Sequence, residues 1–212
     1  MELDHVFVCA NVDAPEAAAL EALGLLPGRS ATHPGQGTAN RCFVFGNAYL
    51  ELIWVHDPVE ASSDLTAPTR LFDRWLGRTG AACPFGFCFR SPPLEGWDYR
   101  PRYLPEGKRI RIGANSDRLD EPMLFLLDFA TRPDTWGRPE ILSHPAGLRE
   151  ITRMTWTRPG DASLTPTMRA VVEGGGLIVE SGAAHALTLE FDGGAAGGSA
   201  SLAPGLPLVL KW

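Results

Sequence analysis

Turn-forming residues are spread so densely along this chain that they exclude an architecture of long helices. The sequence contains 23 glycines and 18 prolines among 212 residues, about a fifth of the chain against roughly 12% in an average protein. Because both residues mark turns, we expect many short strands and short helices joined by tight loops. Hydrophobic residues make up 44% and charged residues 21% of the chain, which is typical of a folded globular protein.

The first 55 residues predict a strand, a helix and three further extended segments. Residues 3–10 are rich in β-forming side chains, and the sequence Asp13-Ala-Pro-Glu predicts a helix that begins there and ends at Leu23, before Gly24. A short extended piece follows. Two β-rich runs, 41–45 and 48–55, then flank a Gly-Asn pair, which is a hairpin signal. The order is therefore β-α-β-β-β.

A similar order recurs in the rest of the chain, with differences. Residues 91–98 are too few and too rich in proline for a full helix, and residues 68–76 predict a connecting helix between the first two units. We expect residues 1–80 and 81–130 to form paired modules, with a third, partial module at 145–212 packed on them. The strands predicted for the second unit are 84–90, 99–104, 108–113 and 123–129.

Several sequence segments resemble one known family. The opening LDHV, the loop HPGQGTAN, the strand YLELIWV, the later HPAG and the ending LEFDGG…PLVLKW are similar to the glyoxalase-like domain of the vicinal-oxygen-chelate superfamily (glyoxalase, bleomycin resistance and dioxygenase proteins). The resemblance implies an α+β fold in which repeated βαβββ modules form a curled mixed sheet, with a cup on one face and helices outside. In metal-dependent members, a divalent ion in the cup binds two adjacent substrate oxygens, with ligands from the first and fourth strands of each module.

Strand alternation predicts that His5 and Glu51 share this cup. If Gly46-Asn47 is a two-residue turn, Cys42 pairs with Glu51, and both face the same side as Asn40 and Tyr49. A carboxylate flanked by two leucines is costly to bury unless it is paired or bound to a cation. His5 is the expected partner, because it matches the first-strand ligand position of the family as Glu51 matches the fourth-strand one.

Two expectations about a metal remain open. His5 and Glu51 together are two candidate ligands for a divalent ion. The corresponding places in the second module fall on Phe85 or Phe87 and on Phe125, and those in the third unit on Arg153 and Thr188, none of which is a usual ligand. Since tight Zn²⁺ and octahedral sites need more than two protein ligands, the same cup without metal is the other expectation.

The predicted site combines an acid, an imidazole and aromatic walls. His5 and Glu51 are the candidate catalytic residues, acting as a general acid and base in which the carboxylate fixes the imidazole tautomer; the alternative is a core pair without chemistry. Arg111 belongs to a basic strand that is either a solvated face or an anchor for a carboxylate. The candidate ligand-binding residues are Gln36, Thr38, Asn40, Cys42, Tyr49, Phe87, Phe125 and Arg111.

Two functions fit this pattern. The first is a glyoxalase-like enzyme, a lyase, isomerase or dioxygenase-like protein, that acts on a small oxygenated molecule; the second is a non-catalytic small-molecule binding or resistance-type protein. A formal charge of −6 argues against nucleic acid and anionic membranes as partners. The sequence shows no targeting signal, no apolar run of membrane-spanning length and no C-x-x-C pair. We therefore expect a cytoplasmic protein with reduced thiols, able to form a homodimer.

Overall fold

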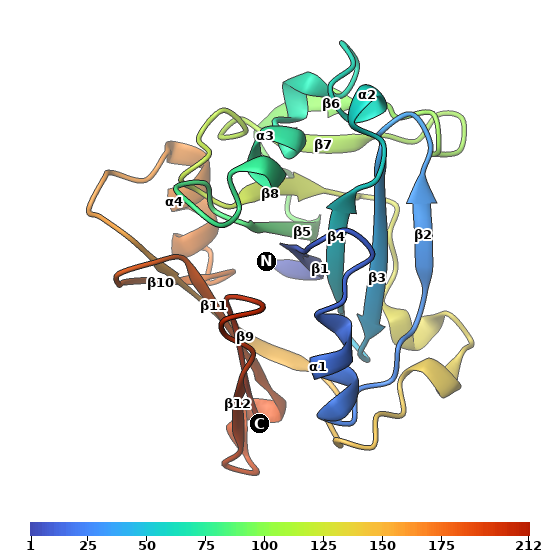
Figure 1. Ribbon diagram of the computed structural model, residues 1–212, viewed down its shortest axis with the longest axis vertical. Helices are drawn as coiled ribbons and strands as arrows, with labels where there is room; N and C mark the ends of the chain where they lie inside the picture. The colour runs from blue at the N-terminus through green and yellow to red at the C-terminus, as the bar shows by residue number, and fades with distance from the viewer.

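The computed structural model describes residues 1–212 and contains two mixed β-sheets with few helices (Figure 1). The larger sheet has eight strands in the order β2-β3-β4-β1-β5-β8-β7-β6. Its strands are β1 (Glu2–Cys9), β2 (Ser30–His33), β3 (Thr38–Val44), β4 (Tyr49–Val55), β5 (Phe85–Ser91), β6 (Gly96–Tyr99), β7 (Ile110–Gly113) and β8 (Met123–Leu126). None of the helices has the length and apolar content needed to cross a bilayer.

The eight-stranded sheet consists of two halves with the same strand order. In each half the first strand lies at the centre of the whole sheet, and the fourth strand lies parallel beside it. The third and second strands follow toward the edge, which gives the orders β1-β4-β3-β2 and β5-β8-β7-β6. Strands β1 and β5 join the halves as an antiparallel pair. This arrangement confirms the predicted α+β fold with repeated modules around a curled sheet.

The predicted hairpin register is confirmed. Cys42 lies opposite Glu51 and Asn40 opposite Ile53, and the amide of Phe45 donates to the carbonyl of Ala48 across the turn. In addition, the Asn47 side chain donates to the carbonyl of Ile151 and accepts from its amide. The turn residue thus also ties the first half of the cup to the second sheet.

The second sheet has five strands in the order β10-β9-β11-β13-β12. In this sheet β10, the strand that follows the helix of the C-terminal unit, pairs directly and in parallel with the first strand, β9. The corresponding strand of the first unit, β2, does not pair with β1 and lies at the edge of the large sheet. The C-terminal unit therefore does not repeat the strand order of the two halves of the cup. Its strands are β9 (Ile151–Arg158), β10 (Ile178–Ser181), β11 (Ala186–Phe191), β12 (Ser199–Ser201) and β13 (Leu208–Lys211).

The main hydrophobic core lies on the side of the large sheet that is opposite to the cup. It combines alternate residues of β1, β4 and β5 with residues of β9, β11, β13 and two helices, and Figure 1 shows the C-terminal sheet beside these strands. A smaller cluster of ten buried residues lies on the cup face. The α-helices are α1 (Ala17–Ala22), α2 (Pro58–Ala61), α3 (Leu71–Leu76) and α4 (Pro166–Glu173), and short 3₁₀ turns occur at 67–69, 133–135, 139–141 and 192–194.

Two predicted elements differ from those observed. The first helix begins at Ala17 rather than near Asp13, because Asp13 and Ala14 have positive φ angles of 66° and 45° that do not continue a helix. The predicted strand 99–104 is also wrong, since β6 ends at Tyr99. Pro101 and Pro105 have no amide hydrogen with which to extend the ladder.

Candidate functional site

A cavity of about 760 Å³ occupies the concave face of the eight-stranded sheet. This size suits a small organic ligand. Strands β1, β3 and β4 and the β2–β3 hairpin contribute its polar side, and β7, β8 and the segments around them contribute its apolar side. Of the ten residues predicted for the site, seven line the cavity: His5, Gln36, Asn40, Cys42, Tyr49, Glu51 and Phe125.

His5 is held from behind by a buried acid that alternation did not predict. Its Nδ1 lies 2.6 Å from Asp4 Oδ1, and the other oxygen of Asp4 accepts from Arg90 Nη1 at 3.0 Å. Because the guanidinium pairs with Asp4 as a carboxylate, Asp4 accepts and His5 Nδ1 donates. Asp4, rather than Glu51, therefore fixes the imidazole tautomer.

A β-bulge explains why Asp4 was missed. On β1, Leu3 and His5 are two residues apart, whereas their partners Phe89 and Cys88 on β5 are adjacent, so Asp4 is an extra residue in the ladder. Strict alternation assigns Leu3 to the cup and Asp4 to the core, but both Asp4 and His5 line the cavity. The available signal was an acid inside an apolar strand, directly before a histidine.

Glu51 faces the opposite nitrogen of the same imidazole. Its Oε2 lies 3.4 Å from His5 Nε2, an ion-pair distance without hydrogen-bond geometry, and its Oε1 accepts from Asn40 Nδ2 at 2.6 Å. Asn40 is oriented in turn, because its Oδ1 accepts from the amide of Ala31. Oε2 and Nε2 therefore border the same space in the cavity and are free to contact one ligand atom or two adjacent ones.

Aromatic rings hold the imidazole in place. Tyr49 stacks on His5 with ring centroids 4.3 Å apart and an interplanar angle of 15°, and Phe125 meets it edge-on at 5.2 Å. The side chains of His5 and Glu51 are only 5% and 7% exposed. The pair is thus immobilised by packing as well as by hydrogen bonds, which a reacting group requires.

A second histidine, His33, lines the cavity beyond Asn40. Its Nε2 lies 3.4 Å from Asn40 Nδ2, which is a donor, and its Nδ1 lies 2.8 Å from Thr38 Oγ1. Nε2 must therefore accept, and Nδ1 carries the proton. Burial lowers the pKa of His33, in agreement with a neutral ring. The histidine was visible in the predicted loop, but its role depends on β2 turning it inward.

Burial also keeps the other ionisable groups of the wall neutral. It raises the pKa values of the Tyr49 and Tyr103 phenols and of the Cys42 thiol well above their ordinary values. At neutral pH these groups are protonated and carry no charge, and the Tyr103 hydroxyl donates to Gln36. The negative charge of the wall is therefore confined to Asp4 and Glu51.

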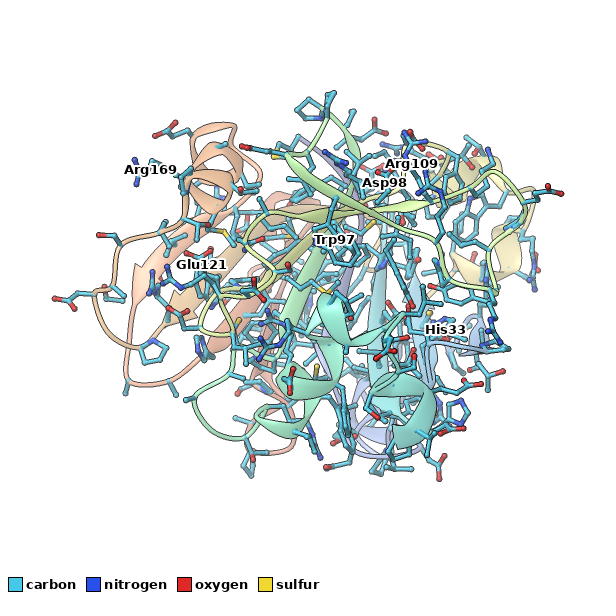
Figure 2. All side chains as sticks on the ribbon, turned by 90° about the horizontal axis from the view of Figure 1, so that it is seen from above. His33, Trp97, Asp98, Arg109, Glu121 and Arg169 are labelled. Carbon is cyan, nitrogen blue, oxygen red and sulfur yellow. The ribbon has the colours of Figure 1, made fainter.

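Three predicted residues lie outside the cavity lining. Phe87 is fully buried in the main core, because Gly86 and Cys88 are the residues of β5 on the cup face. Arg111 lies on the opposite face of β7 from Ile110 and Ile112 and contacts Asp98 at 3.1 Å. Asp98 lies beside Arg109 and apart from His33 in Figure 2.

The third of these residues, Thr38, supports the wall from behind. Its side chain is 1% exposed, and its Oγ1 contacts His33 Nδ1 and accepts from Gln36 Nε2. Gln36 in turn accepts from the Tyr103 hydroxyl at 3.3 Å. Thr38 therefore orients two cavity-lining side chains without reaching the cavity itself.

The possible metal ligands do not make a complete metal site. Ligand atoms of Asp4, His5 and Cys88 lie within 4.8 Å of one another, but Asp4 is already paired with the Arg90 guanidinium, and burial raises the pKa of the Cys88 thiol well above its ordinary value. A cysteine binds a metal ion as its thiolate, and the guanidinium next to Asp4 opposes binding of a second cation there. On the cavity side, His5 and Glu51 offer only two donors, fewer than a closed site requires.

A comparison with family models identifies the family of the chain. A family model described as a glyoxalase-like domain matches residues 3–172. The chain belongs to the glyoxalase-like domain family. The sequence motifs indicated the same glyoxalase-like domain. A search of functionally curated proteins finds no match for the chain.

One solved structure shares the fold at low sequence identity. A hypothetical protein from Staphylococcus aureus is 9% identical, with a TM-score of 0.57 over 99% of this chain and 98% of its own. Methylmalonyl-CoA epimerase from Mycobacterium tuberculosis is 16% identical over 59% of this chain and 86% of its own, with a TM-score of 0.37. A methylmalonyl-CoA epimerase in complex with methylmalonyl-CoA and NH4+ is 16% identical over 62% of this chain and 98% of its own, with a TM-score of 0.38.

Proposed function

We propose that this protein is a glyoxalase-like isomerase or lyase that moves a proton between adjacent carbons of a small carbonyl compound. Glu51 is the base, His5 is the acid, and Asp4 positions His5. The observation that supports this assignment is the 3.4 Å separation of Glu51 Oε2 and His5 Nε2 on the cavity wall, without a hydrogen bond between them.

The proposed step conserves protons and charge. Glu51 Oε2 removes a proton from the carbon next to the carbonyl, while His5 Nε2 donates its proton to the carbonyl oxygen. The product is an enol, with Glu51 neutral and His5 neutral. Where the carbon that loses its proton carries a hydroxyl group, the enol is an enediol: Glu51 then gives its proton to the former carbonyl carbon and His5 Nε2 takes the proton of the other hydroxyl, which yields the isomer and restores both side chains.

The surrounding residues favour this chemistry over a passive pair. Asp4 keeps the Nδ1 proton in place, so only Nε2 exchanges a proton with a ligand. Asn40 fixes Glu51 through Oε1 and leaves Oε2 for the substrate. Tyr49 covers one face of the imidazole and Phe125 packs against it edge-on, which leaves His5 little exposed to water and strengthens the charge interactions inside the cup.

Isotope exchange tests the proposal with a small set of generic carbonyl compounds. Dihydroxyacetone, acetoin and phenylpyruvate are incubated with the protein in D₂O, and loss of the proton signal next to the carbonyl is followed by NMR. We expect protein-dependent exchange with at least one compound and a decrease of roughly 10²–10⁴-fold in the Glu51→Gln variant. Glu106→Gln, at an exposed carboxylate that does not line the cavity, is the matched control and retains the wild-type rate.

A binding protein without turnover is the second candidate, and the apolar second half of the cup favours it. That function predicts saturable binding of such compounds with no deuterium incorporation. A divalent ion held by the two donors His5 and Glu51 would supply the same polarising effect on a substrate oxygen. Titration with Zn²⁺, Mn²⁺, Ni²⁺ and Fe²⁺ tests it: a thermal shift that disappears in Glu51→Gln supports the metal, and no shift contradicts it.

A further inference from the structure

Arg29 is the only lysine or arginine whose side chain lines the cup, and nothing in the fold pairs with its guanidinium. This is unusual within the molecule. Apart from Arg29 and Arg102, every arginine has its guanidinium within 4 Å of a carboxylate or a hydrogen-bond distance of a carbonyl oxygen. Arg29 is thus the unpaired arginine of the cavity in a molecule where, except for Arg102, the other arginines are paired.

Strand register places Arg29 in the same row as the proposed base. The amide of Cys42 donates to the carbonyl of Arg29, and Cys42 lies opposite Glu51 on the next strand. Ala31 and His33 of β2, two and four residues further on, both line the cavity, so alternation turns Arg29 to the same face. Two strand spacings separate the backbones of Arg29 and Glu51, about 10 Å, and both side chains extend over the cup.

Each acidic group of the cup already faces a cationic or imidazole group of the fold, but Arg29 faces neither of them at ion-pair distance. Asp4 is paired with Arg90 at 3.0 Å, and Glu51 faces His5 at 3.4 Å. The guanidinium of Arg29 has no such partner, although the whole chain has a formal charge of −6. A ligand with one negative group supplies that partner, and a planar carboxylate matches the guanidinium fork.

The opposite wall defines the rest of the ligand. Ile110, Ile112, Met123 and Phe125 present a continuous apolar surface across the cavity. A ligand that reaches from Arg29 to Glu51 therefore lays its body against these side chains, which favours an aromatic or aliphatic group over a sugar.

We propose that Arg29 binds a substrate carboxylate and that the substrates of this site are small carboxylic acids with an apolar body. Arg29 then determines specificity, and the carboxylate holds the reacting carbon near Glu51. The position of that carbon rests on the proposed function, but recognition of the carboxylate does not, so the two are tested separately.

Calorimetry with a matched pair of probes tests the assignment. 3-Phenylpropanoate and 3-phenylpropanamide have the same shape and differ in charge. We expect the acid to bind the wild-type protein at least about tenfold more tightly than the amide, and Arg29→Gln to bind both equally. Arg102→Gln, at the other unpaired and exposed arginine, is the control and keeps the preference. Because Arg29 is exposed and unpaired, its replacement leaves the thermal unfolding midpoint unchanged.

Three results overturn the assignment: equal binding of acid and amide by the wild type, an unchanged preference in Arg29→Gln, or no binding of the acid below about 10 mM. The Glu51→Gln variant separates this outcome from the proposed function. If it loses isotope exchange but keeps the preference for the acid, both proposals hold. If it keeps exchange while the preference still depends on Arg29, the carboxylate site stands and the catalytic role of Glu51 fails.

Discussion

The two halves of the cup have the same strand order and very different surfaces. The first half supplies every acidic, basic and imidazole side chain of the cavity wall, including Asp4, His5 and Glu51. The second half supplies phenols and aliphatic or aromatic side chains, with no charge. On β5, the position beside Phe7 is Gly86, where a Cβ atom would collide with the Phe7 ring. The second half therefore leaves room for the Phe7 side chain of the first half and has no counterpart of His5 and Glu51.

This difference shows how one sheet separates two tasks. The polar half holds groups at fixed positions through hydrogen bonds, whereas the apolar half provides volume and excludes water. A repeated module can lose its polar groups on one side without losing the fold, because the core on the opposite face of the sheet is contributed by other residues of the same strands.

Two phenylalanines of the second half give the largest expected contrast. Phe87 is 0% exposed in the main core, and Phe125 borders the cavity. We expect Phe87→Ala to lower the free energy of unfolding by about 4 kcal/mol, because it leaves a closed void. Phe125→Ala costs about 2 kcal/mol, since it only widens an open cavity. Urea unfolding of both variants measures the difference, and equal losses would contradict the assignment of the two faces.

The buried ion pair behind His5 gives the next largest effect. The side chains of Arg90 and Asp4 are 6% and 3% exposed, so Arg90→Met leaves a buried carboxylate without its cation. We expect a loss of about 3 kcal/mol in the free energy of unfolding. The double variant Asp4→Asn, Arg90→Met should recover part of it, because the buried charge is gone. A single-variant loss below about 1 kcal/mol, the range of an exposed pair, would show that Asp4 does not depend on Arg90.

Acid sensitivity is the smallest of these effects. Burial lowers the pKa values of His33, His144 and His185 below the ordinary value of 6.5. The unfolded chain therefore binds more protons than the folded one below about pH 6.5, and stability falls as pH decreases from there toward the folded pKa values. Urea unfolding between pH 7.5 and 5 measures the slope, and His33→Gln should make it shallower. An unchanged slope would mean that His33 is not buried against the cup.

Much of the polar half could be predicted from the sequence because it depends on local geometry. A two-residue turn fixes the register of β3 and β4, and the period of two then assigns Asn40, Cys42 and Glu51 to one face. The same reasoning placed His5 correctly, since alternation resumes after the bulge. The predicted division at residues 130 and 145 and the roles of the site residues stay predictions.

The remaining features depend on a β-bulge and on which strands pair, and the period of two along the sequence reveals neither. The bulge at Asp4 adds one residue, and the parity of β5 depends on its pairing with β1, so Phe87 was assigned to the wrong face. Arg29 lies in the short extended piece predicted at 26–31, but only the pairing of β2 with β3 turns it toward the cavity. Arg111 was singled out as part of a basic cluster, but Asp98 lies next to it across β6 and β7.

Histidine ¹⁵N NMR is the most direct test of the central claim, which is that Asp4 and Glu51 contact opposite nitrogens of His5 at the cavity wall. We predict that Nδ1 of His5 carries a proton in the folded protein, and that Glu51→Gln changes the Nε2 resonance while Nδ1 stays protonated. An Nε2-protonated tautomer with an unprotonated Nδ1, or an Nε2 resonance indifferent to Glu51→Gln, would contradict this claim.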